Sequence, residues 1–591
     1  MSDLPRFDDV RGAGPFGDPA FWGVALAAAI ASVVVGGWSF PANNNVFHLP
    51  IVAGLVEAPE FAGDPFVRSL RHFASGVWMV AAGSARLIDP KISFLVLHVA
   101  SRVLAMVGFL ACADELGVRS TRQRAVAAAL LSVTFLLRGT SFAGEGGLFV
   151  DYFSHSEIGN GLFLLMVRAI LRGSLGAAVA TIGIAIFVNA FFGVWMAFVL
   201  GVTVAAEAVG GRWTTRGSLG GLGAGVAVAA VFVAPVAANI LANPDFGRPI
   251  DFDHAEFLAY YYPYHFLFGE VPAGQKLGLA LVTVAMLCGL AALADPRRRR
   301  MGAVVVAATA LYALGIVAPS LTHAPLVLDL HLLRAGTLIH ELAALLVVLV
   351  AVRRWFDTDR ARRAVVAPAL IVALAVPRGG PAAQVGAAMV IAILCLDRLL
   401  ADPVWHRRLD GFVGDRDRLL RGGAIVVAVA LTGVGFVRTE AKLRVSRAWT
   451  AEWTRVSAWA REATPVGSVF QVPVVRLTDP DPRVAAEKEA LAGATVFETI
   501  SRRSLWVDFK RGAAVMWSPS LHAVWRRRVD EVAALDGTAA RIDHARRHDI
   551  SHVIEIAPAG CRGDFAFRTE RLCVTRVDRS RPSLPSPGGA P

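Results

Sequence analysis

Long apolar runs separated by short charged loops constrain this chain more than any other feature. They recur between Phe21 and Arg438, and charged residues, which make up 18% of the chain, gather between the runs. A helix satisfies its own backbone hydrogen bonds inside lipid, so this pattern is typical of an α-helical polytopic membrane protein. The pattern stops at Thr439, and roughly the last quarter of the chain indicates a soluble α/β domain.

The apolar runs predict about 13 transmembrane helices. We place them at 21–40, 91–113, 125–138, 158–171, 174–190, 191–209, 219–241, 276–294, 301–320, 334–352, 364–377, 381–397 and 423–438. Several of these runs are shorter than the roughly 20 residues that a helix needs to cross a bilayer. A short apolar stretch at 76–88 is interpreted as an interfacial helix beside the first long loop.

Three domains follow from this pattern: a transmembrane domain over 1–438, an extracytoplasmic α/β domain over 439–579 and a disordered tail over 580–591. The tail is rich in proline, serine and glycine, which disfavour a packed core. In the α/β domain, alternating segments predict strands at 468–475, 504–510 and 551–557, and helices near 519–535 and 537–548.

Two further features of the C-terminal part leave alternatives open. A helix with Trp449, Trp453 and Trp459 follows the last span and could lie along the membrane. Cys561 and Cys573 could form a disulfide if the domain is extracytoplasmic, or remain two free thiols.

Arginine is concentrated in alternate loops and fixes the predicted orientation. The arginine-rich loops are 117–124, 168–172, 210–218, 295–300, 353–363 and 398–421. Positive loops stay on the cytoplasmic side, so the N-terminus is predicted inside, and an odd number of spans puts the C-terminal domain outside. We therefore predict a multi-pass protein of the cytoplasmic (inner) membrane. The net charge of +12 is explained by these loops, and no basic stripe interleaved with aromatics indicates nucleic-acid binding.

The loops on the opposite side gather carboxylates, imidazoles and aromatic rings. Their polar residues include Asn43, Asn44, Asn45, His48, Glu57, Glu60, Asp64, Glu145, Asp151, His155, Glu157, Asp245, Asp251, Asp253, His254, Glu256, His265, Glu270, His323, Asp329, His331 and Arg334. Outer loops are polar wherever arginine is excluded, which explains the acids better than the histidines or the run "YYYPYHF". Such aromatics form an interfacial belt or stack on sugar rings.

Ionisable residues also occur inside the predicted spans. His98 and Arg102 are four residues apart and share a helix face, while His340 and Glu341 lie near the outer half of their span. A charge at this depth costs several kcal/mol unless it is paired or solvated. The residues either form an interhelical pair, such as Arg102 with Glu341, or line a wet cavity between the outer halves of the spans.

The segments "NNNVFHLPIVAGLVEAPEFAGDPF", "FAGEGGLFVDYFSHSEIGNGLFLLMVRAILRG" and "YYPYHFLFGE", within this layout, resemble the GT-C superfamily of integral membrane glycosyltransferases. The resemblance implies transfer of a sugar from a polyprenyl-phosphate donor to an envelope glycan, lipid or protein acceptor on the outer face of the membrane. Family members have an acidic residue just after the first span. This chain has Asn43 to Asn45 there, and an amide cannot take a proton from an acceptor.

If the chain is such an enzyme, a general base must deprotonate the acceptor. Asp64 is the first candidate and Asp151 the second, while Arg334 could stabilise the departing phosphate. The other candidate substrate-binding residues are Asn44, His48, Arg102, His155, Glu157 and His265. No ligand-spacing motif demands a metal, so no metal ligands are predicted, although a divalent cation (Mg or Mn) held by Asp64 and Glu157 is compatible with the sequence.

A second function class fits the same layout: a non-catalytic GT-C-like scaffold, or a lipid-linked glycan transporter, in envelope assembly. A transporter is expected to show internal repeats with broken spans in matching positions, and the sequence shows no clear repeat. This favours the transferase, whereas the asparagines after the first span favour the scaffold.

Overall fold

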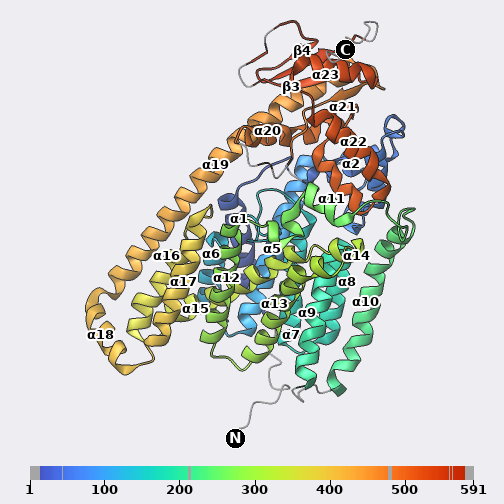
Figure 1. Cartoon of the computed structure of the whole chain (residues 1–591). Helices are drawn as coiled ribbons and strands as arrows, with labels where there is room; N and C mark the ends of the chain where they lie inside the picture. The colour runs from blue at the N-terminus through green and yellow to red at the C-terminus, as the bar shows by residue number, and fades with distance from the viewer. Residues whose placement is uncertain are drawn as a thin grey trace.

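Helices running between two opposite ends of the molecule make up most of the chain, and a small α/β domain covers one of these ends (Figure 1). The computed structural model describes residues 14–42, 44–209, 215–476, 479, 482–557, 560–561 and 563–578. This architecture confirms the predicted class, an α-helical polytopic membrane protein with a C-terminal α/β domain. Asn43 and the predicted tail at 580–591 lie outside the described residues.

Every predicted span coincides with a helix. These helices are α1 (Pro19–Gly36), α5 (Pro90–Glu115), α6 (Thr121–Val133), α7 (His155–Leu171), α8 (Leu175–Val188), α9 (Ala190–Val209), α10 (Thr215–Leu241), α12 (Ala273–Ala292), α13 (Arg298–Leu321), α15 (Gly336–Trp355), α16 (Ala367–Leu374), α17 (Pro381–Leu399) and α19 (Asp417–Ala463). In the part of the chain that the structure describes, nine helical segments are long and apolar enough to cross a membrane. The shorter helices are α6, α7, α8 and α16.

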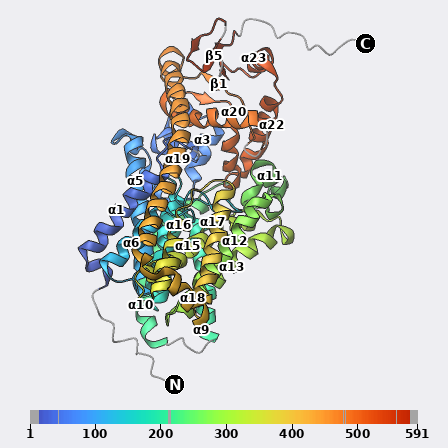
Figure 2. The same ribbon diagram turned by 90° about the vertical axis from the view of Figure 1, so that its left-hand side faces the viewer.

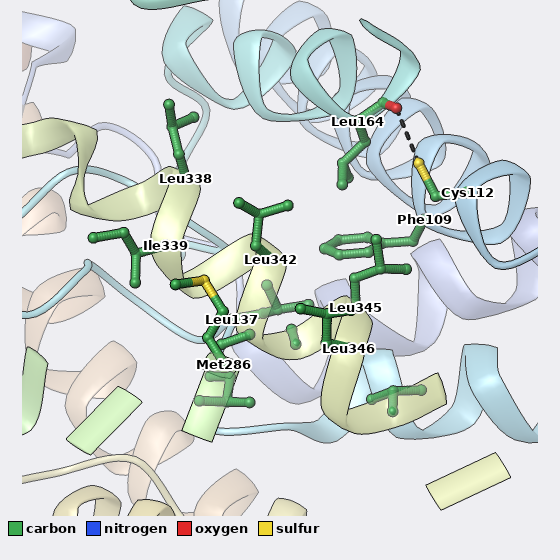
Figure 3. Packing of buried hydrophobic residues seen from close by; sticks show 14 of the residues in the cluster. Phe109, Cys112, Leu137, Leu164, Met286, Leu338, Ile339, Leu342, Leu345 and Leu346 are labelled. Carbon is green, nitrogen blue, oxygen red and sulfur yellow. Dashed lines mark hydrogen bonds between the residues drawn. The ribbon is translucent and has the colours of Figure 1, made fainter. Parts of the chain in front are cut away.

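Helix α15 forms the centre of the bundle, because the whole of its apolar window is buried. Leu342 and Leu345 of α15 lie beside Phe109 of α5 and Leu164 of α7 (Figure 3). The thiol of Cys112 donates to the carbonyl oxygen of Leu164 at 3.1 Å, which joins α5 to α7 in the same layer. This packing fixes the helices whose outer ends carry the polar residues described below.

Ion pairs hold the helix ends together at the pole opposite the α/β domain. The carboxylate of Glu115 forms ion pairs with Arg168, Arg172 and Arg297 at N···O distances of 3.3–3.6 Å. The neighbouring Arg124 bridges Asp18 and Asp114 at 2.7 and 2.6 Å. The arginines that predict a cytoplasmic face therefore also tie the loops of that face to one another.

Short helices fill the loops at the other pole, below the α/β domain. They are α2 (Asn45–Val52), α3 (Pro65–Ser69), α4 (Gly76–Ala81), α11 (His254–Tyr261) and α14 (Pro325–Leu328). The stretch predicted as an interfacial helix at 76–88 contains α4 and a 3-10 turn at Ser84–Arg86. At the arginine-rich pole, α18 (Pro403–Val413) connects α17 to α19.

The C-terminal domain is a five-stranded sheet in the order β2-β1-β3-β5-β4. The strands are β1 (Val469–Gln471), β2 (Ser504–Leu505), β3 (His552–Ile556), β4 (Phe567–Arg568) and β5 (Leu572–Arg576), and the helices are α20 (Pro482–Ala492), α21 (Phe497–Ser501), α22 (His522–Ala533) and α23 (Gly537–Arg547). The three predicted strands contain β1, β2 and β3, which pair in parallel, whereas β4 and β5 are antiparallel additions. Cys561 and Cys573 form a disulfide.

Helix α19 runs without a break for 47 residues from the arginine-rich pole into the α/β domain (Figures 1 and 2). The predicted domain boundary at 438/439 falls inside this helix. Trp453 is fully buried and Trp449 nearly so, and both pack in the core of the domain with Phe497. These tryptophans therefore face the domain, and not a membrane surface as one interpretation of the sequence had it.

Candidate functional site

A cavity of about 480 Å³ lies where the bundle meets the C-terminal domain. Its walls come from the start of the first outer loop, α2, α19, α20 and the segment that follows β2. Eight charged residues line it: Asp151, Lys442, Lys488, Glu489, Glu498, Asp508, Lys510 and Arg511. Apolar side chains, among them Val46, Pro50 and Leu443, form much of the remaining wall. Its mixed lining suits a ligand with an anionic group and an apolar part.

Asp151 and Tyr152 enter the cavity from a loop that folds back on itself. Bridges between Arg138 and Phe149 and between Thr140 and Gly147 hold the two arms of this loop together. The backbone amide of Ser39 donates to the carbonyl oxygen of Asp151 at 2.5 Å, which attaches the loop to the chain leaving α1. The side chain of Asp151 therefore projects from a fixed backbone.

A buried ionic cluster beneath this loop supports it. The Glu157 carboxylate lies 3.0 Å from a guanidinium nitrogen of Arg102 and 3.1 Å from Nδ1 of His98. It also accepts a hydrogen bond from the hydroxyl of Ser101 at 3.1 Å. Arg102 also donates to the carbonyl oxygen of Val150 at 2.5 Å. Residues Arg102 and Glu157, predicted to bind substrate, thus join α5 to α7 and hold the loop just before Asp151.

The interhelical pair suggested from the sequence, Arg102 with Glu341, is not formed. Glu157 lies in the first turn of α7, directly beside Arg102 on α5. Arg102 therefore forms its ion pair with Glu157 and not with Glu341. Glu341 is 1% exposed, and within the described residues neither of its carboxylate oxygens has a hydrogen-bond partner.

Asp151 is held much more loosely than Glu157. Its Oδ2 atom lies 3.5 Å from Nζ of Lys442, and the two side chains are 23% and 71% exposed. An exposed ion pair of this kind is worth little energy. The Asp151 carboxylate is therefore free to exchange this partner for a ligand in the cavity.

Asp64, the first candidate for the base, lies outside this cavity. It is the N-cap of α3, where its carboxylate accepts the backbone amide of Val67 at 3.0 Å. It lines a separate crevice of about 20 Å³ with Arg511 and Arg528. That volume is close to the space of one water molecule, too small for a sugar ring. No described contact joins Asp64 to Glu157, the two residues considered together as ligands of a divalent ion.

Lys510 is a cavity residue that the sequence did not single out. Burial, together with the charge of Arg334, lowers the pKa of Lys510 to about 8. Burial also raises the pKa of Asp508 on the same wall. A lysine with a lowered pKa gains stabilisation when an anion binds beside it. Its signal in the sequence was weak, because "DFKRG" gives no indication that this segment packs against the bundle.

Arg334 approaches the same region from the bundle side, in the 3-10 turn Leu332–Ala335 that leads into α15. It lines a small crevice with His331 and Asn189, and no ion pair to a carboxylate is found for it among the described residues. Its turn touches the loop that carries Glu145. A Cβ atom on Gly144, where φ is +138°, would lie 2.0 Å from the carbonyl oxygen of Leu333, so glycine is required there.

The predicted substrate-binding histidines are mostly packing residues. His48 is 1% exposed and stacks on Trp78 with ring centroids 3.9 Å apart. The indole N–H of Trp78 donates to Nδ1 of His155 at 3.1 Å. Burial lowers the pKa of His265 well below its ordinary value, and the charges of Arg334, His331 and Lys510 add to this shift. Its Nδ1–H donates to the carbonyl oxygen of Gly144 at 2.9 Å.

The asparagines after the first span have a structural role where the structure describes them. Asn44 is the N-cap of α2 without a side-chain capping bond. The side-chain oxygen of Asn45 accepts the backbone amide of Ala42 at 2.8 Å and closes the turn into α2. Asn45 itself is fully buried. Neither amide lines the cavity, whereas Ala42 before them and Val46 and Pro50 after them do.

Comparisons with known proteins find similarity among the solved structures. No protein-family model matches the sequence, and no curated protein sequence matches it. The chain is similar to the crystal structure of ArnT from Cupriavidus metallidurans bound to undecaprenyl phosphate, with 14% identity and a TM-score of 0.45, over 96% of this chain and 99% of that one.

Proposed function

We propose that this protein is a membrane glycosyltransferase that moves a sugar from a polyprenyl-phosphate donor to an envelope glycan, lipid or protein acceptor. The lipid is of the class that the ArnT structure contains. The observation that carries the proposal is the charged cavity between the bundle and the C-terminal domain. It combines a loosely held carboxylate, Asp151, with a buried lysine, Lys510, and an apolar wall.

The height of the cavity suits a lipid-linked donor. The last apolar run ends at Arg438, and Lys442 lies four residues further along the same helix. At 1.5 Å per residue this is a rise of about 6 Å, which puts the cavity at the depth of lipid headgroups. A phosphate at this depth can reach the lysines while its hydrocarbon chain stays in the bilayer.

The residues can be assigned to the steps of an inverting transfer. The acceptor hydroxyl oxygen attacks the anomeric carbon, and the bond from that carbon to the phosphate oxygen breaks with its electron pair going to the phosphate. Asp151 accepts the hydroxyl proton as general base. Lys510 stabilises the charge that develops on the phosphate, with Arg334 adding to the positive field from the bundle side.

The proposal places the N-terminus in the cytoplasm and the C-terminal domain outside the cytoplasmic membrane. The arginine-rich pole supports this orientation, since positive loops stay inside. The Cys561–Cys573 disulfide lies at the opposite pole and suits an oxidising compartment.

The test uses purified protein with a panel of polyprenyl-phosphate sugars and envelope acceptors, and follows release of polyprenyl phosphate. We expect Asp151→Asn to reduce release by 100-fold or more, in line with the roughly 10²–10⁴-fold worth of a general base. The matched control is Asp64→Asn, because asparagine is an equally good N-cap and keeps α3 intact.

The other outcomes are also informative. Loss of release in Asp64→Asn but not in Asp151→Asn would place the base in the first loop and contradict the assignment made here. No release with any donor would favour the scaffold or the glycan transporter. A proposed need for Mg or Mn is tested in the same assay by chelation and re-addition of each ion.

A further inference from the structure

Three potential metal ligands meet in the C-terminal domain, away from the cavity. They are Glu531 on α22, and His544 and His548 on α23. We propose that these side chains bind one divalent transition-metal ion, for which Zn²⁺ is the best fit. The inference is independent of the proposed transferase, because none of the three residues lines the cavity.

The spacing of the ligand atoms suits a shared ion. His544 and His548 are four residues apart, so both rings lie on one face of α23, with centroids 4.4 Å apart. Oε2 of Glu531 lies 3.6 Å from Nε2 of His544 and 3.7 Å from Nε2 of His548. Direct N–H···O hydrogen bonds are shorter, about 2.7–3.2 Å. Tetrahedral zinc with bonds of about 2.0–2.2 Å separates its ligand atoms by roughly 3.3–3.6 Å.

A neighbouring side chain sets His544 in the protonation state that a metal requires. Nδ1 of His544 lies 2.8 Å from Oε1 of Gln471, at the end of β1. The amide oxygen can only accept, so the proton is on Nδ1, and Nε2, which faces Glu531, is the atom that can bind a metal. Metal-bound histidines are commonly oriented by such a hydrogen bond from the other ring nitrogen.

The site also contains polar atoms that need a partner. His544 is 2% exposed, and within the described residues neither its Nε2 nor Oε2 of Glu531 has a hydrogen-bond partner. A buried polar group left without a partner costs about 1–3 kcal/mol. One ion would satisfy both atoms at once.

The surroundings leave room for entry and for a fourth ligand. His548 and Glu531 are each 30% exposed at the side chain, so an ion can reach the site from solvent and keep a bound water. Trp506 covers one side of His548, with ring centroids 5.3 Å apart. Imidazole and carboxylate together favour zinc over calcium or magnesium, which prefer oxygen ligands alone. The ion would tie α22 to α23, with β1 behind them.

The experiment uses the full chain, purified in detergent and stripped of metal. Zn²⁺ is titrated by calorimetry, the melting temperature is followed with and without Zn²⁺, and Co²⁺ is added as a spectroscopic probe. We expect one equivalent of Zn²⁺ per chain, a higher melting temperature that chelation reverses, and visible absorption typical of low-coordinate Co²⁺.

The variants His548→Ala and Glu531→Gln are expected to weaken Zn²⁺ binding at least tenfold and to remove the rise in melting temperature. Both residues are partly exposed, so the apo-proteins should fold. The matched control is His323→Ala, which breaks an exposed His–Asp pair with Asp253 in another loop. Equal binding by wild type and His548→Ala, or equal loss in the control, would overturn the proposal.

Discussion

Two groups of charges lie on either side of one short loop, and they differ in how deeply they are buried and how closely they are paired. Below the loop, Glu157 is 3% exposed at the side chain and holds Arg102, His98 and Ser101. Above it, Asp151 is 23% exposed and pairs at 3.5 Å with Lys442, whose side chain is 71% exposed. The lower group joins helices, whereas the upper group faces a cavity of about 480 Å³.

This difference shows that the burial of a charged side chain does not by itself indicate a ligand-binding site. A buried ion pair whose opposite charges lie in contact holds the structure together, and breaking it leaves an uncompensated charge. A charge with a weak partner beside an open volume can change partner at little cost. Asp151 and Lys510 belong to the second kind, and Arg102 and Glu157 to the first.

The largest expected effect tests this contrast with two matched substitutions. Glu157→Gln leaves Arg102 without a counter-charge inside the bundle and is expected to lower the free energy of unfolding by about 3–5 kcal/mol. Asp151→Asn makes the same chemical change at the cavity and is expected to alter stability by less than about 0.5 kcal/mol. Thermal and denaturant unfolding in detergent measures both.

A double replacement sharpens the result. Arg102→Met combined with Glu157→Met removes both charges, and is expected to recover much of the stability lost in Glu157→Gln. A double variant as unstable as the single one would mean that Arg102 acts through its bond to Val150 and not through its charge. If Asp151→Asn is as unstable as Glu157→Gln, the contrast drawn between the two groups of charges is wrong.

A smaller effect concerns the charge state of Lys510. Burial lowers its pKa to about 8, so the free protein carries this charge below pH 8 and loses it above. A bound phosphate favours the charged form, and its affinity is therefore expected to fall as the pH rises through 8, by up to about tenfold per pH unit. Binding of polyprenyl phosphate between pH 7 and 9 measures this dependence.

The control for the pH series is Lys510→Arg, whose guanidinium stays charged throughout the range. Its affinity profile should be flat between pH 7 and 9. A wild-type profile as flat as that of the arginine variant would show that Lys510 does not contact the phosphate.

The smallest effect is expected at Asp64. Asp64→Ala removes the N-cap of α3 and should cost about 1 kcal/mol of stability, within the usual 0.5–2 kcal/mol for such a cap. Turnover should stay within about twofold of wild type once the protein is folded. Unfolding curves and initial rates on the same preparation separate the effect on stability from the effect on turnover. A large loss of rate without a loss of stability would show that Asp64 takes part in the reaction.

The bundle could be predicted because lipid leaves the backbone few choices. Each apolar run had to become a helix, and all of the predicted spans did, including the short ones at α6 and α16. The strands β4 and β5 were missed. β4 has two residues and forms the edge of the sheet, and β5 lies between it and β3. No long alternation marks either strand in the sequence around the disulfide.

The site was harder to predict because its parts are far apart in the sequence. Asp151, the base in the proposed transfer, was predicted as the second candidate through its place in an outer loop. Lys510 was missed, since only the docking of the C-terminal domain turns its segment towards the cavity. The spacing of His544 and His548 was visible in "HARRH", but Glu531 and Gln471 join them from other elements.

The number of residues in helix α19 fixes how the C-terminal domain is rotated about the helix axis relative to the bundle. Lys442, Leu443 and Ser446 on this helix line the cavity, and Trp449 and Trp453 further along lie in the core of the C-terminal domain. Each residue turns an α-helix by about 100°, because 3.6 residues complete one turn. A single inserted residue between Arg438 and Lys442 would swing the cavity wall and the whole domain around the helix axis. This segment can therefore neither gain nor lose one residue without turning the C-terminal domain away from its contacts with the bundle.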